Sequence, residues 1–257
     1  MKQGRQTVDT RRSRILSMIR EREKIRVEEL AALFHVSLMT IRRDLQALED
    51  QGLIGRFYGG ASVDPYAVAL SGKGTVSDCR RAISRRAAQF VENGDRLFIN
   101  GSSTALDMLD YVNREDVEVF TNNGLAINRA FPSGVEVTLS GGSLRSQGHI
   151  MTGDCAMRNL LMMRAEKAFI GCSGISPVGE ILCDIPTELG INETMISHAY
   201  QYYILADHTK VGKAGTYASF SLETPGTIIT DDQAPASVLN QLRSLGMKVI
   251  QAGLEEE

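Results

Sequence analysis

The sequence predicts an α/β protein of two domains: a small, mainly helical amino-terminal domain and a larger domain built on a mostly parallel β-sheet. The 257 residues are enough for two ordinary domains. The first sixty residues carry the apolar spacing of amphipathic helices, and from Asp78 onward short apolar strands alternate with helical segments. Strands that alternate with helices form parallel sheets covered on both faces.

The amino-terminal domain is expected to begin with two helices separated by a short strand. The first helix is expected to start at Asp9 or Thr10, the strand to span 24–27 and the second helix to span 28–34. Residues 35–36 then form a short turn before a third helix. A helix, a short turn and another helix form the helix-turn-helix arrangement, whose second helix enters the major groove of DNA.

The third helix carries a capping residue and an apolar stripe. Ser37 can act as its N-cap by accepting a hydrogen bond from an amide of the first turn. Ile41, Leu45 and Leu48 recur at helical spacing, so this face is expected to pack inward. The sequence therefore predicts a buried face and an opposite, exposed face on the same helix.

The polar side chains of this helix lie off the apolar stripe. Thr40 offers a hydroxyl, and Arg42 and Arg43 offer guanidinium groups near the start of the helix. Such groups suit phosphate and base-edge contacts in a DNA groove. The alternative is a solvated helix face with two surface arginines, which is the usual meaning of paired charges.

A glycine-rich hairpin is expected after this helix. Gly52 is a natural C-cap, and residues 53–63 favour a hairpin that turns at Gly59–Gly60. This hairpin would form a wing beside the helix-turn-helix. Arg56 is available in it for contact with a backbone phosphate.

Residues 9–63 resemble the amino-terminal domain of the DeoR-type (DeoR/GlpR) bacterial transcriptional regulators. The family signature of Ser, two residues and then Thr-Ile-Arg-Arg-Asp-Leu runs from Ser37 to Leu45, and the wing ends in Gly59-Gly60-Ala61 as in that family. The chain departs from the family at Tyr58, where members often carry His. The resemblance implies a double-stranded DNA operator as partner, bound through Ser37, Met39, Thr40, Arg42, Arg43 and Arg56.

The charge is unevenly distributed along the chain. Residues 1–60 hold 12 Lys and Arg against 8 Asp and Glu, a net charge of +4. The remaining residues hold 16 against 23, a net charge of −7, so the whole chain has a net charge of −3. A basic module joined to an acidic body is expected when only one part touches DNA.

Cysteine and histidine positions argue against a metal centre. The four cysteines show no Cys-x-x-Cys spacing, and the four histidines form no zinc pattern with them, so no metal and no cofactor are predicted. No apolar run is long enough to span a bilayer and the amino-terminus resembles no signal peptide, so a cytoplasmic protein without membrane contact is expected. Buried, reduced thiols are expected at Cys79, Cys155, Cys172 and Cys183.

The sequence predicts a first domain at 1–61, a linker at 62–77 rich in Pro, Gly and Ser, and a second domain at 78–257. The second domain should open with a helix from Asp78 that ends at Asn93–Gly94, and residues 122–124 should begin another helix. Its strands are expected at 96–100, 117–121, 135–140, 168–171, 202–206, 227–230 and 248–251.

The chemistry of a parallel sheet concentrates beyond the carboxyl ends of its strands. Hydroxyls, amides and glycines recur at five such ends, and Gly101–Thr104 is the sharpest because glycine, three hydroxyls and a helix start coincide, as in a phosphate cradle. The alternative there is an ordinary strand-to-helix turn with a Ser or Thr N-cap. Lys210 and Lys213 offer positive charge for a phosphate and Asp207 an acceptor for sugar hydroxyls; the alternative is a solvated loop.

The second domain resembles the effector domain of DeoR-type regulators, which is related to the ribose-5-phosphate isomerase fold. The family's loop motifs appear as Gly101-Ser102-Ser103, Thr121-Asn122, Gly141-Gly142 with Arg145, and Asp207 with Thr209 and Lys210. The resemblance implies an effector site made of Gly101, Ser102, Ser103, Thr104, Thr121, Asn122, Gly141, Gly142, Arg145, Ser173, Asp207 and Lys210.

These observations favour a transcriptional regulator, a repressor of a carbohydrate catabolism operon, whose operator affinity is controlled by a phosphorylated sugar or polyol. The alternative is a sugar-phosphate isomerase that carries a DNA-binding module and needs a carboxylate base. The isomerases place carboxylates in an Asp-Gly-Ala-Asp-Glu loop, whereas the matching loop here, 171–175, has none; Glu180, Asp184 and Glu188 follow nearby.

A third reading, a constitutive architectural DNA binder, leaves five convergent polar loops without a purpose. Operator symmetry predicts a homo-oligomer, a dimer or tetramer.

Overall fold

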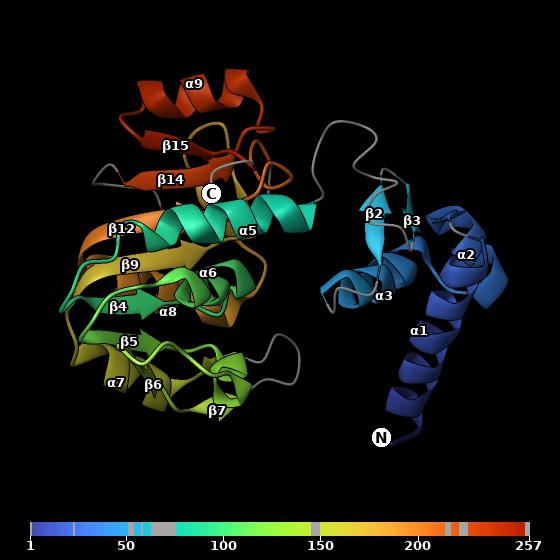
Figure 1. Ribbon diagram of the computed structural model, residues 1–257, viewed down its shortest axis with the longest axis horizontal. Coiled ribbons are helices and arrows are strands. Elements are labelled where there is room, and N and C mark those ends of the chain that lie inside the picture. Colours follow the sequence, from blue (N-terminus) through green and yellow to red (C-terminus); the bar gives the residue numbers. More distant parts are fainter. Residues whose placement is uncertain are drawn as a thin grey trace. The chain divides into compact units, whose positions relative to one another are not determined.

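The computed structural model describes residues 2–22, 24–50, 54–57, 59–62, 76–144, 150–213, 217–220 and 226–254. The chain divides into two compact units, Met1–Asp78 and Cys79–Glu257 (Figure 1). Within the described ranges, no helix is both long enough and apolar enough to cross a membrane. Most of the predicted linker, residues 63–75, lies outside these ranges.

In its described residues the first unit contains three helices and a small antiparallel sheet. The strand order is β1-β3-β2, so the β2–β3 hairpin lies beside the strand that precedes α2. This is the predicted helix-turn-helix with a wing. The elements are α1 (Lys2–Arg22), β1 (Lys24–Arg26), α2 (Val27–Phe34), α3 (Leu38–Asp50), β2 (Gly55–Phe57) and β3 (Gly60–Ser62).

Helix α1 is longer than predicted, because it begins at Lys2 and not at Asp9 or Thr10. Residues 2–8 contain no proline and are dominated by Lys, Gln and Arg, which favour helix even where no apolar stripe marks it. The apolar core of the unit collects one face of each helix and the strands, namely Ile15, Ile19, Ile25, Val27, Leu30, Ala31, Ile41, Leu45, Leu48, Ile54 and Ala61.

The wing turns one residue earlier than predicted. Gly60 pairs with Phe57 inside the sheet, so Gly60 belongs to a strand and Gly59 lies in the turn. Gly59 has a φ of +84°, a conformation that glycine adopts without strain in a tight hairpin turn. Gly52, the predicted C-cap of α3, lies outside the part of the chain that the structure describes.

The second unit is built on a seven-stranded sheet in which every described pair of neighbours is parallel. The strand order is β15-β14-β12-β9-β4-β5-β6. These strands are β4 (Arg96–Ile99), β5 (Val117–Thr121), β6 (Val135–Leu139), β9 (Ala165–Gly171), β12 (Ala199–Leu205), β14 (Thr227–Asp231) and β15 (Lys248–Ala252).

Helices cover both faces of this sheet (Figure 1). Helices α5 (Val76–Ala88) and α6 (Ser103–Asp107) pack on one face, and α7 (Asp154–Leu161), α8 (Pro186–Ser197) and α9 (Ala236–Ser244) pack on the other. Strand residues alternate between the two cores, as a two-sided sheet requires.

In the described residues of this unit, two short antiparallel sheets accompany the large one. The first has the order β10-β11-β13, with β10 (Gly174–Ile175), β11 (Ile181–Cys183) and β13 (Tyr217–Phe220). The second pairs β7 (Ser143–Leu144) with β8 (Met151–Thr152). Strand β11 leads directly toward α8.

Several predicted boundaries shift for local reasons. Helix α5 ends at Ala88, because the amides of Phe90 and Val91 bond to carbonyls three residues back and tighten the last turn. The predicted helix at 122–124 is only the 3₁₀ helix η2 (Gly124–Asn128), and α6 likewise passes into the 3₁₀ helix η1 (Met108–Tyr111). Strands β9 and β12 start earlier than predicted, because each pairs with the other along its whole length.

Candidate DNA-binding surface and ligand pocket

The start of helix α3 is fixed by Ser37. Its Oγ accepts a hydrogen bond from the amide of Thr40 at 3.1 Å and lies 2.9 Å from the Thr40 hydroxyl oxygen. The predicted N-cap is therefore present. Because both hydroxyls take part in the cap, they hold the first turn in place while remaining at the surface.

The exposed side of α3 carries the predicted DNA-contacting residues. Arg42 and Arg43 are exposed, and the side chain of Met39 is 56% exposed. Leu38, which the sequence reasoning omitted, is 42% exposed beside them. Guanidinium groups suit phosphates and guanine edges, and exposed apolar side chains suit thymine methyl groups. Arg56 lies in β2, but its side chain is outside the described part of the structure.

Asp44 of the signature motif faces inward. It is 2% exposed, and its two carboxylate oxygens accept bonds from Arg11 at 2.5 Å and Arg12 at 3.0 Å, both on α1. Sequence reasoning assigned Asp44 no role, although it follows Ile41 by three residues and so falls on the buried stripe. The motif therefore combines outward arginines with a carboxylate that holds α3 against α1.

A cavity of about 290 Å³ lies where β4 and β9 end in the second unit. The segment from the end of β11 into α8 forms another of its walls. Such a position, outside the carboxyl ends of parallel strands, is where open α/β sheets bind ligands. The lining residues are Asn100, Gly101, Ser102, Ser103, Ile150, Gly171, Cys172, Ser173, Cys183, Asp184, Ile185, Glu188, Asn192 and Lys210.

Asn100 organises the floor of this pocket. Its side-chain nitrogen donates to the carbonyl of Gly171 at 2.9 Å and to Oδ1 of Asn192 at 3.1 Å, while its own Oδ1 accepts from the amide of Gly171 at 3.0 Å. One buried side chain thus joins the ends of β4 and β9 to helix α8. Fully satisfied buried networks of this kind rigidify a site.

Two glycines allow the loops to meet closely. A Cβ on Gly171 would lie 2.0 Å from Oγ of Ser102, and a Cβ on Gly101 would lie 2.6 Å from the side chain of Ile150. Neither position has room for a side chain without displacing the wall of the pocket. Gly101 in the predicted loop motif is therefore explained by the close approach of the Ile150 side chain to its backbone.

Charges of both signs line the pocket. Lys210 supplies a positive charge, and Asp184 and Glu188 supply carboxylates from the segment that enters α8. Burial raises the pKa of the Cys172 thiol to about 11, so this pocket residue is neutral at physiological pH. Among the residues that the structure describes, the pocket therefore offers one cation, two acids and the hydroxyls of Ser102, Ser103 and Ser173.

The structure brings together five of the twelve predicted effector-site residues, and Arg145 lies outside the described residues. The other six do not line this pocket. The five that do are Gly101, Ser102, Ser103, Ser173 and Lys210.

The remaining predicted residues have structural contacts. The Thr104 carbonyl accepts from Ser84, Oγ1 of Thr121 accepts from the amide of Asn123, and Asn122 donates to the carbonyl of Met151. Gly141 and Gly142 have φ values of +68° and +98° in the turn after β6. Asp207 is 2% exposed and pairs with Arg80 of α5 at 2.9 Å.

Sequence reasoning did not place Asn100, Asp184, Glu188 or Asn192 in the site. Three of them come from the β11–α8 segment. No pattern in the sequence predicted that this segment lies beside the carboxyl ends of the parallel strands. The available signal was polar residues at Glu188 and Asn192, four apart on one helix face, but such pairs are usually solvated. Here both are buried.

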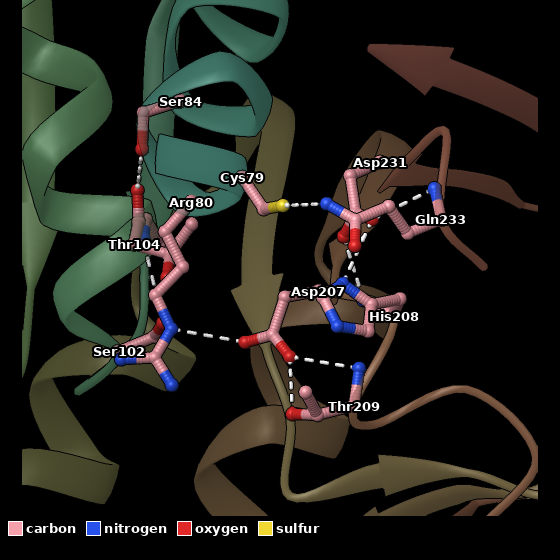
Figure 2. Close-up of polar contacts among 11 residues, drawn as sticks. Cys79, Arg80, Ser84, Ser102, Thr104, Asp207, His208, Thr209, Asp231 and Gln233 are labelled. Atoms are coloured by element: carbon pink, nitrogen blue, oxygen red, sulfur yellow. Dashed lines mark hydrogen bonds and ion pairs between the residues drawn. The ribbon is translucent and has the colours of Figure 1, made fainter. Parts of the chain in front are cut away.

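Cys79, His208 and Asp231 form a second cluster, in which one ligand atom from each lies within 4.8 Å of the others (Figure 2). The spacing would permit a shared cation. However, the Asp231 carboxylate accepts from the His208 amide and lies 2.9 Å from His208 Nδ1, and Gln233 donates to Cys79. These contacts make the cluster a hydrogen-bonded anchor for the start of α5.

The prediction of four buried thiols was wrong in part. Cys79 and Cys183 are buried, Cys172 is half-buried and Cys155 is exposed. Cys155 is the second residue of α7, and its side chain points away from the apolar face that packs on the sheet. A single cysteine in a helix gives no sequence signal for which face it occupies unless the packing face is known.

Comparison with family models decides the identity of the fold. The model for the DeoR-like helix-turn-helix domain matches residues 11–65, and the model for the DeoR C terminal sensor domain matches residues 76–232. The chain belongs to the DeoR family. This DeoR-family protein is a DNA-binding transcriptional regulator, and the predicted fold class, a helix-turn-helix domain followed by a mostly parallel α/β domain, is confirmed.

Relatives of this DeoR-family protein extend over nearly the whole chain. It is 33% identical to the HTH-type transcriptional repressor GlcR of Bacillus subtilis, over 84% of this chain and 86% of that protein. It is 28% identical to the glycerol-3-phosphate regulon repressor of Escherichia coli K12, over 90% of this chain and 94% of that protein.

The solved structures that resemble part of this chain are more distant in sequence. Ribose 5-phosphate isomerase A of Methanocaldococcus jannaschii covers 52% of this chain and 54% of its own, with 12% identity and a TM-score of 0.38. Translation initiation factor eIF-2B of Pyrococcus horikoshii covers 52% and 48%, with 18% identity and a TM-score of 0.40.

Proposed function

We propose that this DeoR-family regulator represses a carbohydrate-use operon and that a phosphorylated sugar or polyol in the pocket at the ends of β4 and β9 controls its affinity for the operator. The observation that carries the proposal is the composition of that pocket. In the described part of the chain, the cation Lys210 lies in the same cavity as three serine hydroxyls and two carboxylates. Relatives named as repressors support the direction of control.

The charges give the ligand an orientation. A bound phosphate would be stabilised by the charge of Lys210 and by hydrogen bonds from hydroxyl donors such as Ser102 and Ser173. Sugar hydroxyls can donate to Asp184 and Glu188, which would repel a phosphate. The phosphate end is therefore placed at Lys210 and the polyol end toward α8.

The DNA side of the proposal uses the exposed start of α3. Arg42, Arg43 and Met39 would read base edges, and Ser37 and Thr40 would sit against the backbone. Arg56 of the wing is proposed to contact a phosphate. Because operators with paired half-sites match symmetric proteins, the active form is proposed to be a dimer or tetramer in the cytoplasm.

We propose further that the chain has no isomerase activity of its own. The loop 171–175 lacks carboxylates, as predicted, but Asp184 and Glu188 bring acids into the pocket from another segment. A base is therefore present in principle, and the regulator is preferred because the relatives are repressors. Turnover of ribose 5-phosphate that is lost in Glu188→Gln would reverse this preference.

A thermal-shift screen tests the ligand class. Glycerol 3-phosphate, ribose 5-phosphate, fructose 6-phosphate and glucose 6-phosphate are compared with the same compounds without phosphate. A ligand at one hundred times its Kd adds about 2.7 kcal/mol to the stability of the folded state. At least one phosphorylated compound should raise the melting temperature of the second unit, and its unphosphorylated counterpart should not.

Two lysine variants make the screen specific for the pocket. Lys210→Met should abolish the shift, because it removes the cation that lines the cavity. Lys213→Met removes the same charge from an exposed residue that does not line the cavity, so its shift should match the wild type. A shift that survives Lys210→Met would place the ligand elsewhere.

A further inference from the structure

Helix α5 is the first helix after the segment that joins the helix-turn-helix domain to the sensor domain. Three residues of α5 contact residues that follow three different strands (Figure 2). Cys79 accepts from Gln233 beyond β14, Arg80 pairs with Asp207 beyond β12, and Ser84 donates to the Thr104 carbonyl beyond β4. Residues from two of these strand ends also line the ligand pocket.

Asp207 connects α5 to the turn that carries Lys210. Its Oδ2 accepts from Nε of Arg80 at 2.9 Å, while its Oδ1 accepts from the amide of Thr209 at 3.0 Å and from the Thr209 hydroxyl. The Asp207 carbonyl also accepts from the amide of Lys210 at 2.8 Å. One buried residue therefore holds the helix on one side and positions the pocket cation on the other.

The second connection between α5 and the pocket runs through the loop 101–104, which carries Ser102 and Ser103. Ser84 is fully buried, and its hydroxyl donates to the Thr104 carbonyl at 2.8 Å. Thr104 directly follows Ser102 and Ser103, which line the pocket, and Ser102 is the N-cap of α6. Helix α5 thus contacts both loops that would hold a phosphate, one through the Asp207 side chain and the other through the Thr104 carbonyl.

Electrostatics make the first connection responsive to charge. Burial raises the pKa of Asp207, but the charges of Arg80 and Lys210 and the bond from Thr209 outweigh burial, so its pKa lies below the ordinary value. The carboxylate is therefore ionised at neutral pH and is stabilised by two cations. An anion bound in the pocket would attract Lys210 and so weaken its interaction with the Asp207 carboxylate. The other cation, Arg80 on α5, would stay paired with that carboxylate.

Resting on the function proposed above, we propose that the Arg80–Asp207 ion pair transmits occupancy of the pocket to helix α5 and so to the DNA-binding domain. A phosphate that engages Lys210 pulls on the 207–210 turn and weakens the hold of Lys210 on the Asp207 carboxylate. Because that carboxylate also anchors Arg80, the position of α5 depends on whether the pocket is filled. The ligand thereby distinguishes two states of the helix, as coupling between sites requires.

The first arm of the test needs no ligand. Hydrogen exchange is measured in the full-length wild type and in Arg80→Gln, with Arg96→Gln as matched control. Arg96 forms an exposed ion pair with Glu166 at the amino-terminal ends of β4 and β9, whereas the pocket lies at their carboxyl ends. This control therefore removes one positive charge away from the pocket. Arg80→Gln should accelerate exchange in residues 207–211 about tenfold, and the control should not.

The second arm measures binding and response separately. For a phosphorylated compound that stabilises the wild type, its affinity and its effect on operator affinity are both determined in each variant. Arg80→Gln should bind the compound within about threefold of the wild type and yet lose the change in operator affinity, which in coupled systems is about 5–150-fold. Arg80→Lys, which keeps the charge, should restore part of the response and guards against a folding defect.

The outcomes separate this inference from the proposed function. If Arg80→Gln responds like the wild type, or if it binds the compound more than about tenfold more weakly, the pair is not a transmitter. If no tested compound binds the wild type, the proposed ligand class fails, and the exchange arm alone decides the coupling. Unchanged exchange at 207–211 in Arg80→Gln overturns the inference whatever the ligand.

Discussion

Replacing Asp44 with Ala should destabilise the helix-turn-helix domain although no DNA contact is lost. Asp44 is 2% exposed and accepts bonds from both Arg11 and Arg12. Removing one partner of a buried ion pair costs about 3–5 kcal/mol. Arg11 and Arg12 keep side-chain exposures of 16% and 31%, so their guanidinium groups can rehydrate, and we expect a loss of about 2 kcal/mol.

This loss can be measured by calorimetry on the full-length protein. In a domain of this size, 1 kcal/mol corresponds to a shift of about 4–8 °C, so the transition of the first unit should fall by roughly 10 °C. The transition of the second unit should not move, because Arg11 and Arg12, which pair with Asp44, both lie on α1 of the first unit. Asp44→Asn keeps a hydrogen-bond acceptor without the charge, so the melting temperature of its first unit should lie between those of the wild type and Asp44→Ala.

Arg42→Ala is the matched control for stability, because Arg42 lies on the same helix and is exposed. Substitutions of exposed residues change stability by about 0.5 kcal/mol or less. If Asp44→Ala lowers the first transition no more than Arg42→Ala does, the clamp between α3 and α1 contributes nothing and the reasoning fails.

Further predictions concern binding and reactivity. Arg42→Ala and Arg43→Ala should each weaken operator binding by about 1–3 kcal/mol at fixed salt with an unchanged melting temperature. Ser102→Glu, which places a negative charge in the pocket, should bind operator normally but no longer respond to the effector. The purified protein should not interconvert aldose and ketose phosphates above background. A thiol reagent at pH 8 should modify Cys155 rapidly, because the other three thiols are shielded and have raised pKa values.

Each of these has a result that contradicts it. Wild-type operator affinity in both arginine variants removes the start of α3 from its proposed role. A normal response in Ser102→Glu places the effector outside the pocket, and isomerase turnover restores the enzyme interpretation. Two thiols that react at equal rates would contradict the burial of the remaining cysteines.

Local sequence determined the elements that depend on short-range chemistry. The Ser37 cap and the Ile41, Leu45 and Leu48 stripe follow from spacing along one helix, and the structure shows both. The parallel strands were visible because buried strands are continuous apolar runs. The boundaries were less accurate, since helix ends such as that of α5 are set by 3₁₀ bonds that leave little trace in residue type.

The pocket was determined only in part by the sequence. Loops at carboxyl ends of parallel strands meet at one edge, which is why Gly101–Ser103, Ser173 and Lys210 were found together. Asp184 and Glu188 could not be found in this way, because they reach the pocket through a short antiparallel sheet and the start of α8.

Tertiary structure alone decided the roles of the acidic residues. From the sequence, Asp44 was only a residue of the family signature with no assigned role, and Asp207 was an expected acceptor for sugar hydroxyls. In the fold, Asp44 meets arginines more than thirty positions earlier and Asp207 meets Arg80 more than a hundred positions earlier. A charge can be buried only when an opposite charge is brought to it, and which distant arginine arrives is fixed by the packing of helices, which no local pattern contains.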